Sequence, residues 1–393
     1  MDQKFDAIRP FYDHEVNDAI LSIIHDPMMK PIMRFTFPEK EESVWKQELT
    51  QIHSTQEFQA QVVAKSLEQI LAKSAEGLTY SGFENLDKQT AYLYISNHRD
   101  IILDTSFLNL ILHYTGLVMT ASAIGDNLLK KPFFYALSKI NRNFIVKRGL
   151  SPRELLQSSK LLSEYIHELV TAENRSVWIA QREGRTKDGK DATHQGVLKM
   201  LSMAAQNENP AQYFKKMKFV PVSISYEYDP TDSLKLPELL ANLNNEAYVK
   251  EENEDFNTLL NGLIGQKKRI HFHAGNVLDA ELDCIAELPN ANQQIRAIAQ
   301  LIDERIIGNY KLWPTNYIAY DSLHKTGVFK SFYTPAEKDV FFKRFESKID
   351  TSDQQTVESF LEMYANPVVN QMKLTENHPP QYNEVGCQVS DVG

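Results

Sequence analysis

The sequence contains only two cysteines among its 393 residues, Cys284 and Cys387, and they lie far apart in the chain. Two thiols are too few for a disulfide framework or for a cysteine zinc site. The first residues also lack the basic start and the apolar stretch of a secretory signal peptide. We therefore expect a cytoplasmic protein in a reducing compartment.

An excess of basic residues is also lacking, because 52 acidic side chains outnumber 42 lysines and arginines and leave a formal charge of −10. A polyanion requires a broad basic surface, so nucleic acid is not an expected partner. The hydrophobic share of 42 % is typical of a globular protein, which argues against disorder throughout the chain.

No apolar run is long and uninterrupted enough for a membrane span. The most apolar window, from Phe107 to Gly125, contains Asn109, His113 and Thr115, and polar groups inside a bilayer are unfavourable. A helix, a turn and a strand explain this window better. If the substrate is a lipid, we expect the protein to meet it as a peripheral protein on the inner face of the membrane.

Short apolar runs rich in β-branched and aromatic residues alternate with amphipathic segments from Ala91 onwards. They predict strands at 91–96, 117–122, 143–147, 176–181, 219–226 and 269–274, with helices at 103–113, 126–139, 152–170 and 195–205. This pattern indicates an α/β fold with a mixed, largely parallel sheet covered by helices.

The regions on either side of this pattern have a different character. We expect a helical N-terminal region at 1–85, the α/β domain at 86–285 and a helical C-terminal region at 286–374, with helices at 295–307 and 336–364. The polar tail at 375–393 is expected to be disordered.

The first candidate for chemistry is His98, which follows the strand 91–96 and opens a helix. Ligands bind at the carboxyl edge of α/β sheets, and histidine accepts protons near neutral pH. A carboxylate in the first helical turn would hold the second ring nitrogen, and both Asp100 and Asp104 are available. The alternative is that His98 only caps the helix and Asp104 is a favourable acid in its first turn.

Three further predicted strands carry residues suited to binding a substrate. Lys147-Arg148 ends the strand 143–147, and arginine binds phosphate through two parallel hydrogen bonds. Glu183-Gly184-Arg185 follows the strand 176–181, where glycine permits a tight turn and close ligand approach. Pro221 predicts a bulge or an edge that meets substrate, because proline is rare inside a central strand. Taken singly, the two charged segments are equally typical of a solvated strand end or a surface turn.

Together and in this order, the four segments resemble the four sequence blocks of the glycerolipid acyltransferase superfamily, which includes the glycerol-3-phosphate and 1-acylglycerol-3-phosphate acyltransferases. Asn97-His98-Arg99 is similar to the first block and Phe144–Arg148 to the second. Glu183-Gly184-Arg185 is similar to the third and Val220-Pro221-Val222 to the fourth. The likeness covers residues 90 to 230.

The resemblance implies an O-acyltransferase of phospholipid biosynthesis that works by direct transfer. His98 would act as general base on a hydroxyl of glycerol-3-phosphate or lysophosphatidate, which attacks the thioester of acyl-CoA or acyl carrier protein; no other cofactor is implied. Lys147, Arg148 and Arg185 would hold the phosphate. The full set expected to bind substrate is Arg99, Lys147, Arg148, Glu183, Gly184, Arg185 and Pro221. The sequence lacks a Gly-x-Ser-x-Gly nucleophile elbow, which agrees with transfer without a covalent intermediate.

The sequence departs from the family pattern in the first block. The family separates its histidine and aspartate by four residues, whereas Leu103 occupies that place here and Asp104 comes one residue later. We expect Asp104 still to reach His98, with Asp100 as the alternative. Two other functions remain open: an acyltransferase for another lysophospholipid or lipid acceptor, and a membrane-surface module impaired by the displaced aspartate.

Seven basic residues lie between Leu128 and Arg153 with no acid among them and with aromatic residues interleaved. This composition is suited to docking on an anionic lipid surface. The alternatives are a core helix with a solvated basic edge and a groove for the phosphates of the acyl donor. The seven are Lys130, Lys131, Lys139, Arg142, Lys147, Arg148 and Arg153.

His271 and His273 alternate on a predicted strand, a spacing that can suggest metal ligation. Two histidines without a third ligand are more typical of a structural role at a strand end. No metal is expected.

Overall fold

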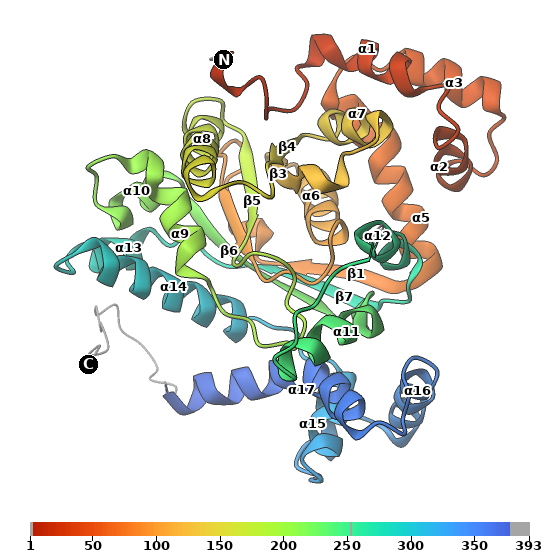
Figure 1. Cartoon of the computed structure of the whole chain (residues 1–393), viewed down its shortest axis with the longest axis vertical. Coiled ribbons are helices and arrows are strands. Elements are labelled where there is room, and N and C mark those ends of the chain that lie inside the picture. The colour runs from red at the N-terminus through yellow and green to blue at the C-terminus, as the bar shows by residue number, and fades with distance from the viewer. Residues whose placement is uncertain (1–2, 252–253, 378–393) are drawn as a thin grey trace.

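A seven-stranded sheet forms the centre of the protein in the computed structural model, which describes residues 3–251 and 254–377. Its strands are β1 (Ala75–Ser81), β2 (Leu93–Ser96), β3 (Thr120–Gly125), β4 (Asn143–Val146), β5 (Ser176–Ala180), β6 (Phe219–Tyr226) and β7 (Lys268–Ala274). They are arranged in the order β1-β7-β6-β2-β5-β3-β4 (Figure 1). The five strands from β6 to β4 are parallel, whereas β7 is antiparallel to β6. The predicted mixed, largely parallel sheet is confirmed.

Helices cover both faces of the sheet, because the strand residues alternate between two hydrophobic cores. Leu93 and Ile95 of β2 belong to one core, which is completed by α8 (Pro152–Thr171), α9 (Gln195–Leu201), α10 (Pro210–Lys216), α13 (Asp279–Ala286) and α14 (Ala291–Gly308). Tyr94 belongs to the other core, with α5 (Ala64–Ser74), α6 (Leu103–Thr115) and one residue of α12 (Glu254–Ile264). Figure 1 shows these two helical layers on either side of the sheet. Burial on both faces explains why the strands are nearly continuous apolar runs.

The apolar window from Phe107 to Gly125 folds as a helix, a turn and a strand, as predicted. Helix α6 ends at Thr115, and Gly116 caps it with a positive φ of 72°, a conformation that glycine adopts without strain. The chain then turns into β3. Within the part of the chain that the structure describes, no helix is long and apolar enough to cross a bilayer.

The N-terminal region is helical up to Ser74, but the predicted boundary at residue 85 is wrong. Residues Ala75–Ser81 form β1, which pairs with β7 at the edge of the sheet. Only two of its seven residues are aliphatic, and most are exposed, so the strand gave no apolar signal. The remaining helices are α1 (Asp13–Ile23), α2 (Met29–Thr36), α3 (Glu42–Thr50) and α4 (Thr55–Phe58), and they share a third core with α7 (Pro132–Ile140).

The C-terminal region has its own core, built from α11 (Asp232–Leu243), α15 (Pro314–Leu323), α16 (Pro335–Glu346) and α17 (Gln354–Asn377). The single helix predicted at 336–364 is therefore two helices. Helix α14, which was assigned to this region, packs against the sheet instead. Helix α17 continues past the predicted limit at 374, and the rest of the predicted tail lies outside the described residues.

Short 3₁₀ or π turns connect several of these elements. They lie at Gln3–Phe5, Gln59–Val63, Phe83–Asn85, Asp126–Leu128, Ser202–Ala205 and Lys330–Phe332.

Candidate active site

His98 lies at the carboxyl edge of the sheet, two residues after β2 ends at Ser96. The preceding residue, Asn97, is fully buried and bridges to the neighbouring strand β6. Its amide Nδ2 donates to the Ile224 carbonyl oxygen at 2.9 Å, and its Oδ1 accepts from the Ile224 N–H at 2.8 Å. These two hydrogen bonds fix the backbone that carries His98.

The carboxylate of Asp104, in the first turn of α6, contacts the imidazole. His98 Nδ1 lies 2.8 Å from Asp104 Oδ2, and a carboxylate only accepts hydrogen bonds, so Nδ1 carries the proton. The same oxygen accepts the backbone N–H groups of Arg99 at 2.6 Å and Asp100 at 3.0 Å. Asp104 has no exposed surface. One buried oxygen of Asp104 therefore accepts hydrogen bonds from the imidazole and from the backbone of the two residues that follow His98.

Asp100 lies close by but makes different hydrogen bonds. Its Oδ1 accepts the N–H groups of Ile102 and Leu103 at 3.0 and 2.9 Å, which satisfies donors at the start of α6. Its Oδ2 is buried and has no hydrogen-bond partner among the described residues. Burial, followed by the charge of Asp104, raises the pKa of Asp100. The geometry thus favours Asp104, not Asp100, as the partner of His98.

Two aromatic side chains that the sequence did not single out complete the surroundings of His98. The ring of Trp178 on β5 meets the imidazole edge-on, with centroids 5.4 Å apart, and its Nε1–H donates to Ser96 Oγ at 2.9 Å. The hydroxyl of Tyr226, the last residue of β6, donates to Asp104 Oδ1 at 3.0 Å. Both lie in apolar strands and look like core residues, because the sequence does not reveal that β5 and β6 flank β2.

Arg99 is buried and ion-paired within the protein, with Nη2 2.5 Å from Asp191 Oδ2. Asp191 also accepts hydrogen bonds from Thr186 Oγ1, at 2.7 Å, and from the hydroxyl of Tyr310. The Thr186 N–H donates to the His98 carbonyl oxygen at 2.9 Å. Arg99 therefore joins the segment of His98 to the loop after β5, and its guanidinium is already occupied in this structure. Asp191 and Tyr310 were not predicted.

Lys147 and Arg148 follow β4 and are both exposed. Arg148 forms an ion pair with Glu183, which lies in the loop after β5. Strand β4 is separated from β2 by β3 and β5, so at the usual strand spacing its end lies roughly 14 Å from that of β2. Arg148 therefore contacts the third block through Glu183, and both basic residues sit at the rim of the site.

Arg185 lies nearer to His98, because it follows β5, the strand next to β2. Gly184, just before it, has a φ of 70°, which is the turn conformation that favours glycine. The guanidinium Nη1 of Arg185 donates to Thr231 Oγ1 at 3.2 Å and is half-buried. Of the predicted phosphate-binding residues, Arg185 is therefore the one in a loop that follows a strand adjacent to β2.

The loop that carries Arg185 is held from outside the sheet by α17. Asn366 Nδ2 donates to the Asp188 carbonyl oxygen at 2.6 Å, and Asn370 Nδ2 donates to that of Gly189 at 3.2 Å. Gly189 has a φ of 74°, and a Cβ there would come within 2.5 Å of the Met363 carbonyl oxygen. The C-terminal region thus contacts the candidate site directly.

The prediction that Pro221 marks a bulge or an edge is wrong. Pro221 is buried inside β6, in register with Ile95 of β2, and the register has no shift there. Its carbonyl accepts the Gly275 N–H at 2.8 Å, and the pairing of β6 with β7 begins at the next residue, Val222. Proline has no backbone N–H to donate, and it is tolerated here because the pairing of β6 with β7 begins only at the next residue. The part of β6 that reaches the site is Ile224 and Tyr226.

The basic stretch does not form one patch. Lys139 and Arg142 are buried, with Lys139 over the rings of Phe11 and Tyr135 and Arg142 donating to Thr55 Oγ1 at 3.1 Å. Burial lowers the pKa of Arg142 to about 10. The other five basic residues, Lys130, Lys131, Lys147, Arg148 and Arg153, are exposed.

His271 and His273 hydrogen-bond to the hydroxyl groups of β1. Ser81 Oγ lies 3.2 Å from His271 Nε2 and 2.9 Å from His273 Nδ1. Burial, with the charge of Lys311, lowers the pKa of His271 to about 4. Over residues 3–251 and 254–377, no three histidine, cysteine or acidic side chains are grouped as metal ligands would be.

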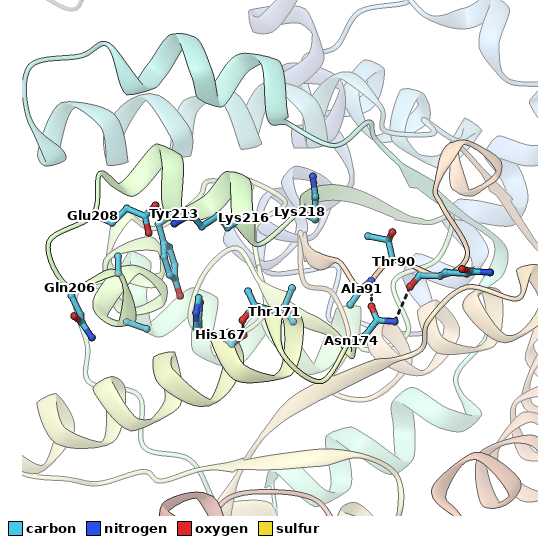
Figure 2. Close-up of a pocket in the computed structure, with 14 residues that line it drawn as sticks. Thr90, Ala91, His167, Thr171, Asn174, Gln206, Glu208, Tyr213, Lys216 and Lys218 are labelled. Atoms are coloured by element: carbon cyan, nitrogen blue, oxygen red, sulfur yellow. Dashed lines mark hydrogen bonds and ion pairs between the residues drawn. The ribbon is translucent and has the colours of Figure 1, made fainter. Parts of the chain in front are cut away.

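A groove of about 680 Å³ lies at the opposite edge of the sheet, where β2 and β6 begin (Figure 2). His167 of α8 stacks on Tyr213 of α10 at one end, and Thr90 and Ala91 line the other. Its two lysines, Lys216 and Lys218, are ion-paired with Glu208 and Asp279. None of the predicted site residues lines this groove, so the candidate active site is not there.

A comparison with protein families agrees with the motifs. Residues 77–225 match the family model described as Acyltransferase. No curated protein sequence matches the chain. Among solved structures, the 1-acyl-sn-glycerophosphate (LPA) acyltransferase PlsC from Thermotoga maritima is similar at 12 % identity and a TM-score of 0.36, over 74 % of this chain and 91 % of that one. The matched segment holds all four candidate blocks, the strands β2 to β5 and all of β6 except Tyr226, so this part of the chain is similar to an acyltransferase domain.

Proposed function

We propose that the protein is an O-acyltransferase that transfers a fatty acyl group from a thioester donor to a hydroxyl of glycerol-3-phosphate or 1-acylglycerol-3-phosphate, with His98 as general base. The observation that carries the proposal is the His98–Asp104 contact of 2.8 Å at the carboxyl edge of the sheet. Because Nδ1 holds its proton against Asp104, Nε2 is the basic nitrogen. Nε2 makes no hydrogen bond within the described residues, and His98 is partly exposed.

The transfer is a direct displacement at the thioester carbonyl. His98 Nε2 removes the proton of the acceptor hydroxyl while its oxygen attacks, and Asp104 stabilises the imidazolium that forms. When the tetrahedral intermediate collapses, the carbon–sulfur bond breaks and the imidazolium returns the proton to the leaving thiolate. The products are the ester and the free thiol of CoA or of an acyl carrier protein, so no additional cofactor is needed.

Arg185 is the best placed residue for the acceptor phosphate. It follows the strand next to that of His98, whereas the side chains of Lys147 and Arg148 start from a strand end roughly 14 Å away. Because glycerol phosphate is a small molecule, the cation that binds its phosphate has to lie close to His98, where its hydroxyl reacts. Lys147 and Arg148 are better placed for the phosphates of the donor or for lipid headgroups, and Glu183 orients Arg148 through their ion pair.

Lipid substrates have to be reached at a membrane, and we infer peripheral binding on the cytoplasmic face. The exposed basic residues Lys147, Arg148 and Arg153 lie near this edge of the sheet. Beside them Leu155 and Leu156, in the first turn of α8, are 54 % and 59 % exposed. Exposed leucines next to basic residues are the combination that interfacial segments use.

The alternative acceptors, another lysophospholipid or lipid A precursor, would use the same base and are separated from glycerol phosphates only by assay. A catalytically impaired membrane-surface module was considered because Asp104 is displaced in the sequence. The contact between Asp104 and His98 supports the catalytic proposal over that alternative.

The test is a transfer assay with the purified chain, a long-chain acyl-CoA or acyl carrier protein, and each candidate acceptor. We expect His98→Ala to lower turnover by at least about 100-fold, the usual size of a general-base contribution. The matched control is His113→Ala, which removes an exposed histidine near the C-terminal end of α6, the helix that carries Asp104. A folded His98→Ala protein that turns over as fast as His113→Ala would contradict the mechanism.

A further inference from the structure

Tyr226 contacts the carboxylate that holds His98 from the side opposite to the imidazole. Its hydroxyl lies 3.0 Å from Asp104 Oδ1, and no other hydrogen bond to that oxygen occurs in the described residues. The other oxygen, Oδ2, accepts from the His98 imidazole and from two backbone N–H groups. The phenol therefore satisfies the half of the carboxylate that the backbone does not reach.

We propose that Tyr226 is a positioning residue for the His98–Asp104 pair, and that its hydroxyl orients the Asp104 carboxylate so that Oδ2 faces His98 Nδ1. This inference rests on the proposed role of His98 as base. Tyr226 does not contact the reacting atoms. It acts through Asp104, which acts on His98.

The burial of this contact makes it directional. Asp104 has no exposed surface and Tyr226 is 8 % exposed, so water does not replace either partner. A buried carboxylate oxygen without a donor is strongly unfavourable. Rotation of the carboxylate about its Cβ–Cγ bond would leave an oxygen unpaired. The phenol therefore holds the carboxylate in one orientation.

The Tyr226 hydroxyl stays protonated and therefore stays a hydrogen-bond donor. Burial, followed by the charges of Asp104 and Asp100, raises the pKa of Tyr226 well above its usual value. Around the pair, Asp100 and Arg99 come from the turn before α6, and Asp229 comes from the segment after β6. Of these, Asp100 and Asp229 raise the Tyr226 pKa further, so the hydroxyl keeps its proton. During transfer the acceptor's proton moves to His98 Nε2, and Tyr226 neither gains nor loses one.

The variant that removes only this hydrogen bond is Tyr226→Phe. The control is Tyr94→Phe on β2, which removes a phenol hydroxyl from the same hydrophobic core. The Tyr94 hydroxyl is buried and has no hydrogen-bond partner among the described residues, so no hydrogen bond is lost there. Thermal melting curves establish that both variants fold.

We expect Tyr226→Phe to lower kcat by about 10-fold or more while KM stays close to that of wild type, because the acceptor site is untouched. The acid limb of kcat/KM is expected to move to higher pH. The reason is that the carboxylate charge, no longer shared with the phenol, is concentrated beside His98 and favours the imidazolium. Tyr94→Phe is expected to change neither. If the two variants have the same kcat and the same acid limb, Tyr226 is only a packing residue.

A second measurement separates this inference from the proposed function. The ring nitrogens of His98 are followed by NMR in protein labelled at histidine, with the His98→Asn spectrum to identify its signal among the 11 histidines. Tyr226→Phe is expected to shift the titration midpoint of His98 upwards, and Tyr94→Phe is expected to leave it in place. An inert wild type with a shifted midpoint would refute the acyltransferase proposal but not the positioning role. An unshifted midpoint would refute the positioning role itself.

Discussion

At the residue scale, the two candidate carboxylates differ in what surrounds them. Asp104 accepts four hydrogen bonds, one of them from His98, whereas Asp100 satisfies two N–H groups at the start of α6 through a single oxygen. The raised pKa of Asp100 disfavours its charged form, which is a poor property for a group that has to stabilise an imidazolium. The two residues are therefore expected to respond differently to the same substitution.

Asp104→Asn is expected to lower turnover by at least about 100-fold, because an amide neither stabilises the imidazolium nor fixes the correct tautomer. Asp100→Asn keeps the Oδ1 acceptor for Ile102 and Leu103 and is expected to change turnover by less than about 3-fold. Steady-state kinetics of both proteins with the same acceptor measure the difference. Equal losses in two folded variants would show that Asp104 has no special relation to His98.

Some residues of the candidate site were predictable because a residue type and its place after a strand end suffice. His98, Arg185 and the pair Lys147-Arg148 are of that kind. Others depend on which strands are neighbours. Tyr226 and Asp191 belong to the site only because β6 and the loop after β5 lie beside β2, and no local pattern encodes that order.

Arg99 was expected to bind substrate as a cation of the first block, but nothing in the sequence indicated its partner. In the fold it is enclosed with Asp191, so its charge is already balanced inside the protein. Pro221 was misjudged because the rule that proline avoids central strands depends on where the partner ladder starts.

At the scale of elements, apolar strands between helices were predictable, since burial on both faces leaves a strong composition signal. Strand β1 was not, because it is a mostly exposed edge strand that follows α5 without a break. The split between α16 and α17 was also missed, since the polar stretch between them is short. Neither β1 nor the break between α16 and α17 includes the strand ends that form the candidate site.

Helix α17 is the element whose role was least visible in the sequence. Its two asparagines donate to successive carbonyl groups of the loop that carries Arg185, and the same helix packs with α11 and α15 in the C-terminal core. Figure 1 shows α17 in blue along the lower side of the sheet domain. The loop is therefore held between the sheet and the C-terminal region.

The double variant Asn366→Ala/Asn370→Ala is expected to raise KM for the phosphate-bearing acceptor by about 5- to 10-fold, with a smaller change in kcat. Each lost hydrogen bond is worth about 1 kcal/mol, and the loop that it orders carries Arg185, the residue proposed for the phosphate, rather than the base. Thr375→Ala, further along the same helix and exposed, is the control. A double variant whose KM matches that of the control would show that α17 does not order the loop.

At the scale of the whole molecule, charge is distributed unevenly. The chain carries a formal charge of −10, yet every residue from Lys147 to Gln157 except Leu150 is exposed, and the exposed residues of this segment include three basic residues and two leucines. It joins β4 to α8 near the edge of the sheet that carries His98. A membrane bound at this segment would bring lipid substrates to the side of the molecule where the candidate base lies.

This arrangement predicts that Lys147→Glu/Arg153→Glu weakens binding to vesicles that contain anionic lipid by at least about 30-fold, since each basic residue at the surface contributes about 1 kcal/mol. Lys325→Glu/Lys330→Glu makes the same change of charge at exposed positions in the C-terminal region and is expected to bind as wild type does. Leu155→Asp, which puts a charge in place of an exposed leucine, is expected to weaken binding even where salt screens the basic residues. Vesicle co-sedimentation at low and high salt measures all three. If both charge-reversed proteins lose affinity equally, net charge and not this segment governs the association; if neither does, the docking surface lies elsewhere.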